Sequence, residues 1–168
     1  MAGVLTRMAQ RVTIQGVPLY LTLEDVADPA PKKVMEKTRG GSFVEREVST
    51  GIEAMTGTLT ISGARSEVLV MYGLQAGSNC AVTIEEAYRD EDGGEFKLKA
   101  EWIGEINNVE DSNTKMGELS QTVLTVSCKR KKKTINGKIC WEVASDGSVV
   151  NLGQEDFLAP FRALIGMN

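Results

Sequence analysis

Apolar and polar residues alternate along most of this chain, with a period of two. Met55, Leu59 and Ile61 would share one face of an extended strand, and the threonines between them would share the other face. This period predicts strands that bury one face. The same pattern predicts further strands at 12–14, 19–23, 81–88, 96–102 and 119–128. The expected class is mainly β, an antiparallel β-sandwich or barrel.

Turn and helix signals separate these strands. Asn136-Gly137 lies between two strand-like runs and predicts a hairpin with a two-residue turn. A short helix is predicted at about 64–73, because apolar residues recur at helical spacing and Gly73 suits its end. A second short helix or bent turn is predicted within 154–166, provided that Pro160 lies in the first turn. Residues 107–118 read as a polar loop.

The stretch 32–63 is predicted to form a long protruding hairpin, with Arg39, Gly40 and Gly41 at its tip. Its first arm, 32–38, mixes a few apolar residues with lysines and a glutamate, and it is too polar to lie inside a core. An isolated two-stranded ribbon is marginally stable in water. The hairpin must therefore contact something outside its own domain or be mobile, and we interpret it as an assembly element.

Composition narrows the functional classes. The chain has 168 residues, which we expect to form a single domain over 1–168. A net charge of −4 disfavours a protein that grips nucleic acid. The absence of histidine removes Ser-His and Cys-His catalysis and the commonest transition-metal ligand. No run reaches the roughly 18 apolar residues of a membrane-spanning helix, so we expect a soluble protein with no membrane partner.

Several short motifs follow one another in a fixed order along the chain. They are Gly16-Val17-Pro18, the prolines Pro29 and Pro31, Arg39-Gly40-Gly41, Gly63-Ala64-Arg65-Ser66-Glu67, Tyr72-Gly73-Leu74 and Asn136-Gly137. By this order and spacing, the chain resembles the major tail tube protein of contractile-tailed phages and R-type tailocins. The resemblance covers nearly the whole chain.

The resemblance implies a structural subunit and no enzyme. Such subunits form stacked rings, six per ring, and the stack is a hollow tube through which DNA passes without sequence-specific binding. The partners implied are further copies of the chain, the tail sheath protein, and the baseplate and tail terminator proteins. The expected location is the tail of a virion, assembled in the host cytoplasm. No catalytic residue, cofactor or metal is expected.

The main charge block is Lys129, Arg130, Lys131, Lys132 and Lys133. On an extended strand the five side chains alternate between two faces, so they cannot all meet one partner. One interpretation is a solvated edge that lysines protect from wrong pairing. A phosphate-binding or acidic-protein patch is a second. The resemblance adds a third, a surface that faces the sheath.

Three acidic residues of the hairpin, Glu45, Glu47 and Glu53, have the same sequence parity. On an unbroken strand they would share one face. The simple interpretation is a solvated face. If the strands line a channel, the same residues would form an acidic wall that repels nucleic acid and lets it slide.

The chain has three cysteines, Cys80, Cys128 and Cys140, an odd number that cannot pair completely within one subunit. If Asn136-Gly137 is a two-residue turn, Cys140 faces Lys133 and Cys128 faces Ser145, so the two are not cross-strand partners. The alternatives are three reduced thiols, as expected in a reducing cytoplasm, or an inter-subunit disulfide that Cys80, placed in a turn, would reach.

Other functional classes remain open at this stage. A type VI secretion-like tube protein would share the architecture and pass effectors instead of a genome. A monomeric β-barrel would bind nucleic acid through 129–133, with Trp141 or Tyr88 as stacking platforms. Residues 90–95 carry clustered carboxylates but lack the ligand spacing of an EF-hand, so a hairpin turn is the expected structure. An enzyme would have to be a carboxylate-based hydrolase, and no acidic pair stands out.

Overall fold

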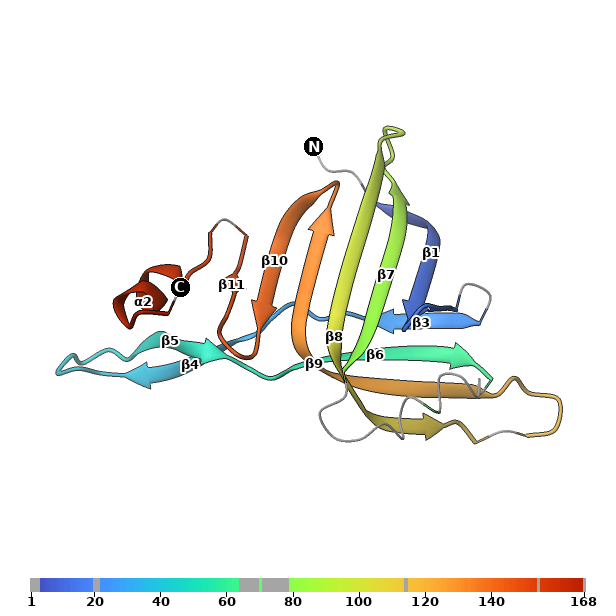
Figure 1. The fold of residues 1–168 in the computed structure, drawn as a ribbon, viewed down its shortest axis with the longest axis horizontal. Helices are drawn as coiled ribbons and strands as arrows, with labels where there is room; N and C mark the ends of the chain where they lie inside the picture. The colour runs from blue at the N-terminus through green and yellow to red at the C-terminus, as the bar shows by residue number, and fades with distance from the viewer. Residues whose placement is uncertain are drawn as a thin grey trace.

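The computed structural model describes residues 4–19, 22–63, 70, 79–113, 115–153 and 155–167. The protein is mainly antiparallel β, as the alternation predicted (Figure 1). The elements are β1 Thr6–Ile14, β2 Val17–Pro18, β3 Leu23–Ala27, β4 Lys33–Thr38, β5 Arg46–Ile52, β6 Met55–Ser62, β7 Cys80–Arg89, β8 Glu95–Asp111, β9 Gln121–Ile135, β10 Lys138–Ala144, β11 Val150–Asn151 and the helix α2 Ala159–Leu164.

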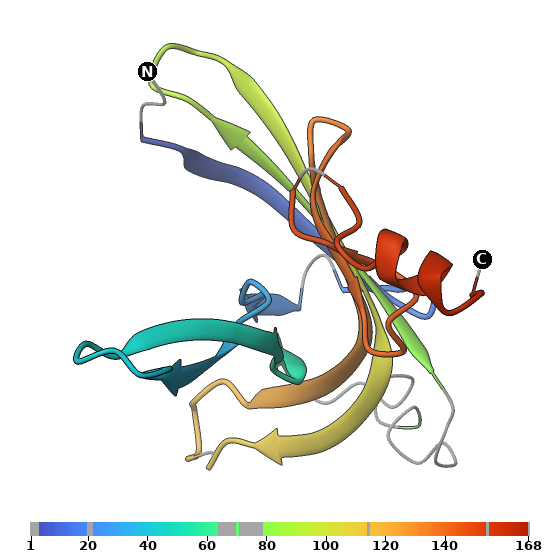
Figure 2. The same cartoon turned by 90° about the vertical axis from the view of Figure 1, so that its left-hand side faces the viewer.

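The large sheet runs in the order β11-β10-β9-β8-β7-β1-β2. Strand β9 pairs with β8 along one edge, and its other edge is divided, with the first half paired to β6 and the second half to β10. Strand β3 continues this branch by pairing with β6. The long strands β8 and β9 curve, so the branch carrying β6 and β3 folds over the main sheet (Figure 2). The result is a curled sheet that is not closed into a barrel.

The core lies between the main sheet and the branch that folds over it. Aliphatic side chains fill it, together with the buried ring of Trp102. Gly57 on β6 leaves room for that ring, since a Cβ there would lie 2.5 Å from a ring carbon. The buried apolar residues are Val12, Ile14, Leu19, Met55, Leu59, Ile61, Cys80, Val82, Ile84, Ala100, Trp102, Ile106, Leu124, Val126, Cys128 and Val143.

The turns predicted at 136–137 and 90–94 and the predicted place of Pro160 are confirmed. Asn136 and Gly137 have φ values of 48° and 79° and join β9 to β10. The segment Asp90–Gly94 closes the hairpin between β7 and β8, with a hydrogen bond of 2.8 Å from the Asp90 N–H to the Gly94 carbonyl. Pro160 lies in the first turn of α2, the position that a proline tolerates.

Four predicted boundaries were wrong. The strand predicted at 19–23 begins only at Leu23, as β3, and Leu19 lies outside any strand. The protruding hairpin is β4 and β5 alone, because β6 belongs to the large sheet and its apolar face enters the core. Residues 107–111 continue β8 and are not part of a loop, since they pair with β9 across a bulge. The strand predicted at 119–128 extends to Ile135. The helix predicted at 64–73 lies outside the described residues, apart from Val70.

A buried ion pair fixes the segment that leads from β3 into β4. Lys131 is 1% exposed, and its ammonium lies 2.7 Å from the Asp28 carboxylate and donates to the Pro29 carbonyl at 2.5 Å. Trp102 donates its indole N–H to the same carboxylate at 2.9 Å. The Lys131 ammonium lies 5.4 Å from the centre of the Trp102 ring, and Lys133 approaches Asp28 to 3.6 Å. These contacts attach the root of the projecting hairpin to β8 and β9.

Replacing Lys131 with Met should lower the free energy of unfolding by about 3 kcal/mol, because it leaves the largely buried Asp28 carboxylate with only the Trp102 N–H and the more distant Lys133 as partners. Lys132→Met is the matched control: it removes a lysine from the opposite face, where the side chain is 34% exposed and 3.9 Å from Glu142. We expect the control to change stability by less than about 1 kcal/mol. Urea unfolding of both variants measures the difference, and equal small losses would contradict the anchoring role.

Candidate assembly interface

The projecting hairpin is a two-stranded ribbon made of β4 and β5, separate from the large sheet. Its root, where the ribbon leaves the domain, is the pair of Lys33 and Ile52. The pairing register shifts once along the ribbon, because Thr50 has no partner on β4. All of β5 before Ile52 is exposed, and four of the six residues of β4 are exposed. The ribbon projects away from the large sheet (Figure 1). It therefore has two uncovered faces, as expected for an assembly element.

The tip of the ribbon reverses at Gly40 and Gly41, which have φ values of 51° and 81°. Ser42 closes the turn by donating its N–H to the Arg39 carbonyl at 2.8 Å. The next two residues, Phe43 and Val44, are 99% and 70% exposed. Alternation did not predict this apolar pair, although two apolar residues directly after a Gly-Gly turn in a polar hairpin indicate an exposed contact.

The three glutamates of the hairpin do not lie on one unbroken strand. Glu45 precedes β5 and Glu53 follows it, and the omission of Thr50 from the pairing breaks the parity between them. Glu45 lies 3.0 Å from Arg39 and Glu53 lies 3.1 Å from Lys32, while Glu47 stands opposite Lys37. Each carboxylate thus has a cation beside it, which reduces the negative potential that a wall of these residues would carry.

The basic block divides between the two faces of β9, as predicted, but the bulge at Lys129 decides which residue faces which way. Lys131 and Lys133 point to the inner face and bind Asp28. Arg130 and Lys132 lie on the outer face, where both contact the Glu142 carboxylate. Of the five, Lys129 alone has no ion-pair partner among the described residues. The block does not present one continuous basic surface.

The two rings proposed as stacking platforms for nucleic acid already carry cations. Lys133 lies over Trp141 at 4.9 Å from the ring centre, and Arg7 lies over Tyr88 at 5.9 Å. Tyr88 also donates its hydroxyl to the buried Glu86 at 2.8 Å. These contacts and the divided basic block disfavour a groove that would bind single-stranded nucleic acid.

The cysteines are placed differently from the predictions. Cys80 is the first residue of β7 and not part of a turn, and both it and Cys128 stand opposite Gly104 on the intervening strand. Both are buried, at 2% and 5% exposure, and burial raises the pKa of the Cys128 thiol to about 11. Cys140 is left out of the pairing between β9 and β10, so Trp141 and not Cys140 faces Lys133. Cys140 is half-buried.

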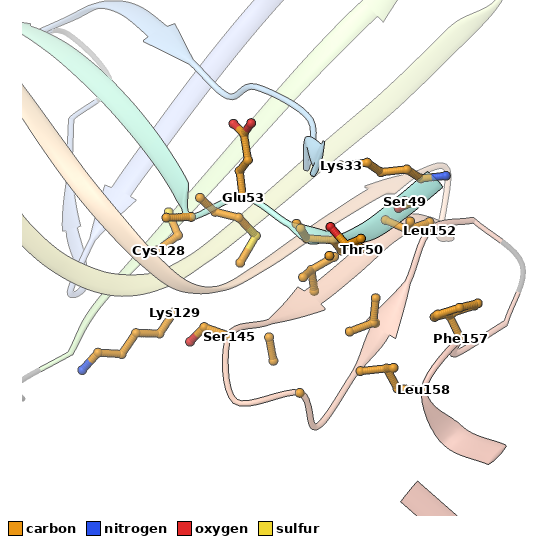
Figure 3. Close-up of a pocket in the computed structure, with 18 of the residues that line it drawn as sticks. Lys33, Ser49, Thr50, Glu53, Cys128, Lys129, Ser145, Leu152, Phe157 and Leu158 are labelled. Atoms are coloured by element: carbon orange, nitrogen blue, oxygen red, sulfur yellow. The ribbon is translucent and has the colours of Figure 1, made fainter. Parts of the chain in front are cut away.

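A groove of about 690 Å³ lies between the root of the ribbon and the last strands of the chain. Figure 3 shows Ser49 and Thr50 of β5 on one side, and Phe157 and Leu158 of the C-terminal segment on the other. The rest of the lining is largely apolar, and Lys33 and Lys129 lie at its edge. The lining includes Ile52, Met55, Cys128, Val143, Ala144, Val150 and Leu152.

The C-terminal segment adds further exposed apolar surface. Phe157 and Phe161 stack with ring centres 5.7 Å apart, and both are exposed. Asp156 pairs with Arg162 and accepts hydrogen bonds from the backbone N–H groups of Val150 and Leu158, which holds the segment against β11. The Arg162 contact first, and then these N–H groups, lower the pKa of the Asp156 carboxyl. The helix α2 buries none of its residues. The segment is thus held by polar contacts at its start, while its apolar side chains remain uncovered.

Chemical sites do not stand out in the described part of the chain. Within it, no three His, Cys, Asp or Glu side chains are grouped so that they could hold a metal ion. No described helix is both long and apolar enough to cross a membrane. In the acidic turn 90–95, the Asp90 carboxylate accepts a hydrogen bond of 2.7 Å from the Glu91 N–H, an arrangement typical of turns.

Comparison with known proteins agrees with this geometry. The model of the family described as phage tail tube protein FII matches residues 8–166. A search of curated proteins finds no match. Among solved structures, the sheath/tube terminator of an extracellular contractile injection system, PVC, in the extended state shares the fold with a TM-score of 0.60 and 10% identity, covering 75% of this chain and 93% of that chain.

Two further cryo-EM structures share the fold. The PVC sheath-tube complex in the extended state matches with a TM-score of 0.57 and 10% identity over 75% of this chain and 88% of that one. The anti-feeding prophage cap, a tube-terminating cap, matches with a TM-score of 0.55 and 12% identity over 76% and 87%. Since the family model spans nearly the whole sequence, the chain belongs to the phage tail tube protein FII family.

Proposed function

We propose that this tail tube protein is a structural subunit that assembles into stacked rings of six, forming a hollow tube for DNA in a contractile tail. The observation that carries the proposal is the β4–β5 ribbon, which projects from the domain with both faces uncovered. A ribbon of two strands gains little stability by itself. Contacts with a neighbouring subunit would cover it.

The edges of the large sheet supply a way to close a ring. The sheet ends at β2 and β11, which pair with only two residues each of β1 and β10. Most of the outer edge of β1 therefore has no strand partner in the described structure, and the same holds for the first half of β10. Open edges of this kind favour association with another chain. In a ring, the edge of one subunit would pair with that of the next, so that the sheets form one closed barrel.

The remaining partners follow from the family and from the shared fold. The neighbouring structures include a sheath-tube complex and tube terminators, which supports contacts of this chain with a sheath and a terminator. We extend this proposal to the baseplate, to a tail location in the virion and to assembly in the host cytoplasm. The function is structural, without catalysis, and Arg130, Lys132 and Lys129 are the members of the basic block available to a sheath.

An acidic wall of Glu45, Glu47 and Glu53 along the channel has less support than the assembly role of the ribbon. Glu45 and Glu53 form ion pairs, so a channel lined by this ribbon would be closer to neutral than the sequence alone suggests. Exposed pairs of this kind are weak, and a cation that moves to another partner in the tube would release the carboxylate. Glu47 stands opposite Lys37 but forms no ion pair within the described residues, so it is the most available of the three.

Deleting residues 34–50 should leave a folded monomer that no longer forms tubes. The deletion joins Lys33 to Gly51, and the register places Lys33 opposite Ile52, so the new junction is short and every core strand is retained. Circular dichroism and sedimentation compare the variant with the full chain, and electron microscopy of both at high concentration looks for rings or tubes. A full chain that is monomeric at all concentrations contradicts the proposed function, and tubes from the shortened chain contradict the role of the ribbon.

Replacing both Gly40 and Gly41 with Val should reduce stacking more than folding. A branched residue at positive φ costs on the order of 1–3 kcal/mol, and the two glycines have φ values of 51° and 81°. The strain would distort only the tip, which contributes nothing to the core. Tube yield and thermal unfolding are measured together. An unchanged yield with a lower melting temperature would show that the turn matters for folding and not for assembly.

Any covalent link between subunits is expected to run through Cys140 alone. At pH 8 the Cys128 thiol, with its pKa raised to about 11, stays protonated, and burial also raises the pKa of Cys80. One thiol per native chain should react quickly with a thiol reagent, and three after denaturation. With a single reactive thiol, non-reducing gels of blocked particles should show dimers at most, and Cys140→Ser should remove them. A ladder of larger multimers would mean that Cys80 or Cys128 becomes exposed in the tube.

A further inference from the structure

We propose that Asn136 is a site of spontaneous chemical modification that the folded protein suppresses. The reaction is deamidation, in which the backbone nitrogen of Gly137 attacks the side-chain carbonyl carbon of Asn136. It starts when the turn between β9 and β10 opens, and one of its two products cannot restore that turn. The inference concerns the single chain and does not depend on assembly into a tube.

The sequence places the reacting groups side by side. Glycine directly follows Asn136, whereas the other asparagines precede cysteine, asparagine, valine, threonine or leucine, or end the sequence. Glycine has no side chain to shield its nitrogen from an approaching group. Asn136 and Gly137 are both exposed, and the Gly137 N–H donates no hydrogen bond within the described residues. A nucleophile, a carbonyl carbon and water are therefore all available at this turn.

The reaction requires only water as a co-reactant. A bond forms between Cγ of Asn136 and the Gly137 nitrogen, which loses its proton to solvent. The bond from Cγ to the side-chain nitrogen breaks, and this nitrogen takes up a proton and leaves as ammonia. Water then opens the five-membered ring at either carbonyl, which gives aspartate or isoaspartate, and no group is oxidised or reduced. In isoaspartate the main chain runs through Cβ and Cγ and is longer by one atom.

The turn holds the reacting atoms apart. Asn136 and Gly137 have φ values of 48° and 79°, and two such residues between the paired Ile135 and Lys138 form a type I′ turn. In this turn the Cβ of Asn136 and the nitrogen of Gly137 lie on opposite sides of the bond between Cα and the carbonyl carbon. Ring closure requires both atoms on the same side of that bond. The folded protein must therefore open this turn before it can react.

Two hydrogen bonds to β8 resist the opening. Oδ1 of Asn136 accepts the Lys97 N–H at 2.8 Å, and the N–H of Asn136 donates to the Lys97 carbonyl at 2.8 Å. The Asn136 side chain thus continues the ladder of β8 and β9 beyond its last pair, Leu98 and Ile135. The same contact fixes the carboxamide whose carbon has to reach Gly137. The backbone of Lys97 therefore controls how often the reaction can start.

The two products differ in whether the turn can form again. Aspartate keeps an oxygen in the place of Oδ1, so it can still accept the Lys97 N–H. Isoaspartate adds a main-chain atom to a two-residue turn, and the length of a turn fixes the register of its strands. The pairing of Lys138 with Ile135 is then lost. A brief opening of the turn is thereby converted into a permanent change at the start of β10.

A comparison of the folded and the unfolded chain tests the suppression. The full chain is incubated at one pH with and without guanidinium chloride, and trypsin then releases the peptide 134–138 by cleavage after Lys133 and Lys138. Mass spectrometry follows the replacement of NH2 by OH, and chromatography separates aspartate from isoaspartate. We expect the folded chain to react about 30-fold more slowly, the ratio that two hydrogen bonds of typical net strength produce. Equal rates in the two states overturn the inference.

Lys97→Pro tests the contact with β8. Proline removes the N–H that Oδ1 accepts and leaves the carbonyl of residue 97 in place. Lys97→Ala is the matched control, since it removes the same side chain and its ion pair with Glu85 but keeps the N–H. We expect Lys97→Pro to speed the reaction of the folded chain about fivefold, as the loss of one hydrogen bond does, and Lys97→Ala to leave it unchanged. Equal rates in the two folded variants contradict the role of this contact.

Hydrogen exchange gives a second test, which holds even if proline disturbs the strand. In the unchanged protein, guanidinium chloride below the unfolding transition should speed the modification by the same factor as the exchange of the Lys97 amide. After ageing in denaturant and refolding, isoaspartate chains should lose the protection of this amide, and Asn136→Asp chains should retain it. A modification rate that does not follow this exchange, or full protection in isoaspartate chains, overturns the inference.

Discussion

The buried ion pair between Lys131 and Asp28 determines where the ribbon leaves the domain. A buried charge is costly unless a partner and hydrogen bonds compensate for it, and here one carboxylate binds Lys131, Trp102 and, at a longer distance, Lys133. Asp28 lies in the segment between β3 and β4, so the network ties the start of the ribbon to the two longest strands of the sheet. Ile52, which packs against the core, and the hydrogen bond of 2.8 Å from the Glu53 N–H to the Lys32 carbonyl hold the other side of the root.

The position of Lys131 depends in turn on one irregularity in the sheet. Cys128 and Lys131 are three residues apart and would face opposite sides of a regular strand. Because Lys129 is left out of the pairing with β8, both face the core. A single bulge thus converts part of an apparent surface charge block into an internal anchor. Bulges are known to redirect side chains in this way.

The sequence was most informative where local chemistry alone decides the structure. The Asn136-Gly137 turn, the turn at 90–94 and the place of Pro160 follow from the backbone preferences of those residues. It was least informative where one residue leaves a ladder, as Thr50, Lys129 and Cys140 do. The alternation of apolar and polar residues does not reveal such a bulge, so the cross-strand partners beyond it were predicted wrongly. The C-terminal end of the hairpin was also predicted wrongly. Strand β6 directly follows β5 in the sequence, but it pairs with β3 and β9 in the large sheet.

A subunit that stacks, as we propose for this chain, has to remain soluble before it does so. The ribbon meets this requirement with one ion pair at its tip, Arg39–Glu45, and one at its root, Lys32–Glu53, and by confining its most exposed apolar residues to the tip, Phe43 and Val44. In the proposed stack, a neighbouring copy would cover the ribbon, and the apolar surface buried there would stabilise an element that two strands alone leave marginal.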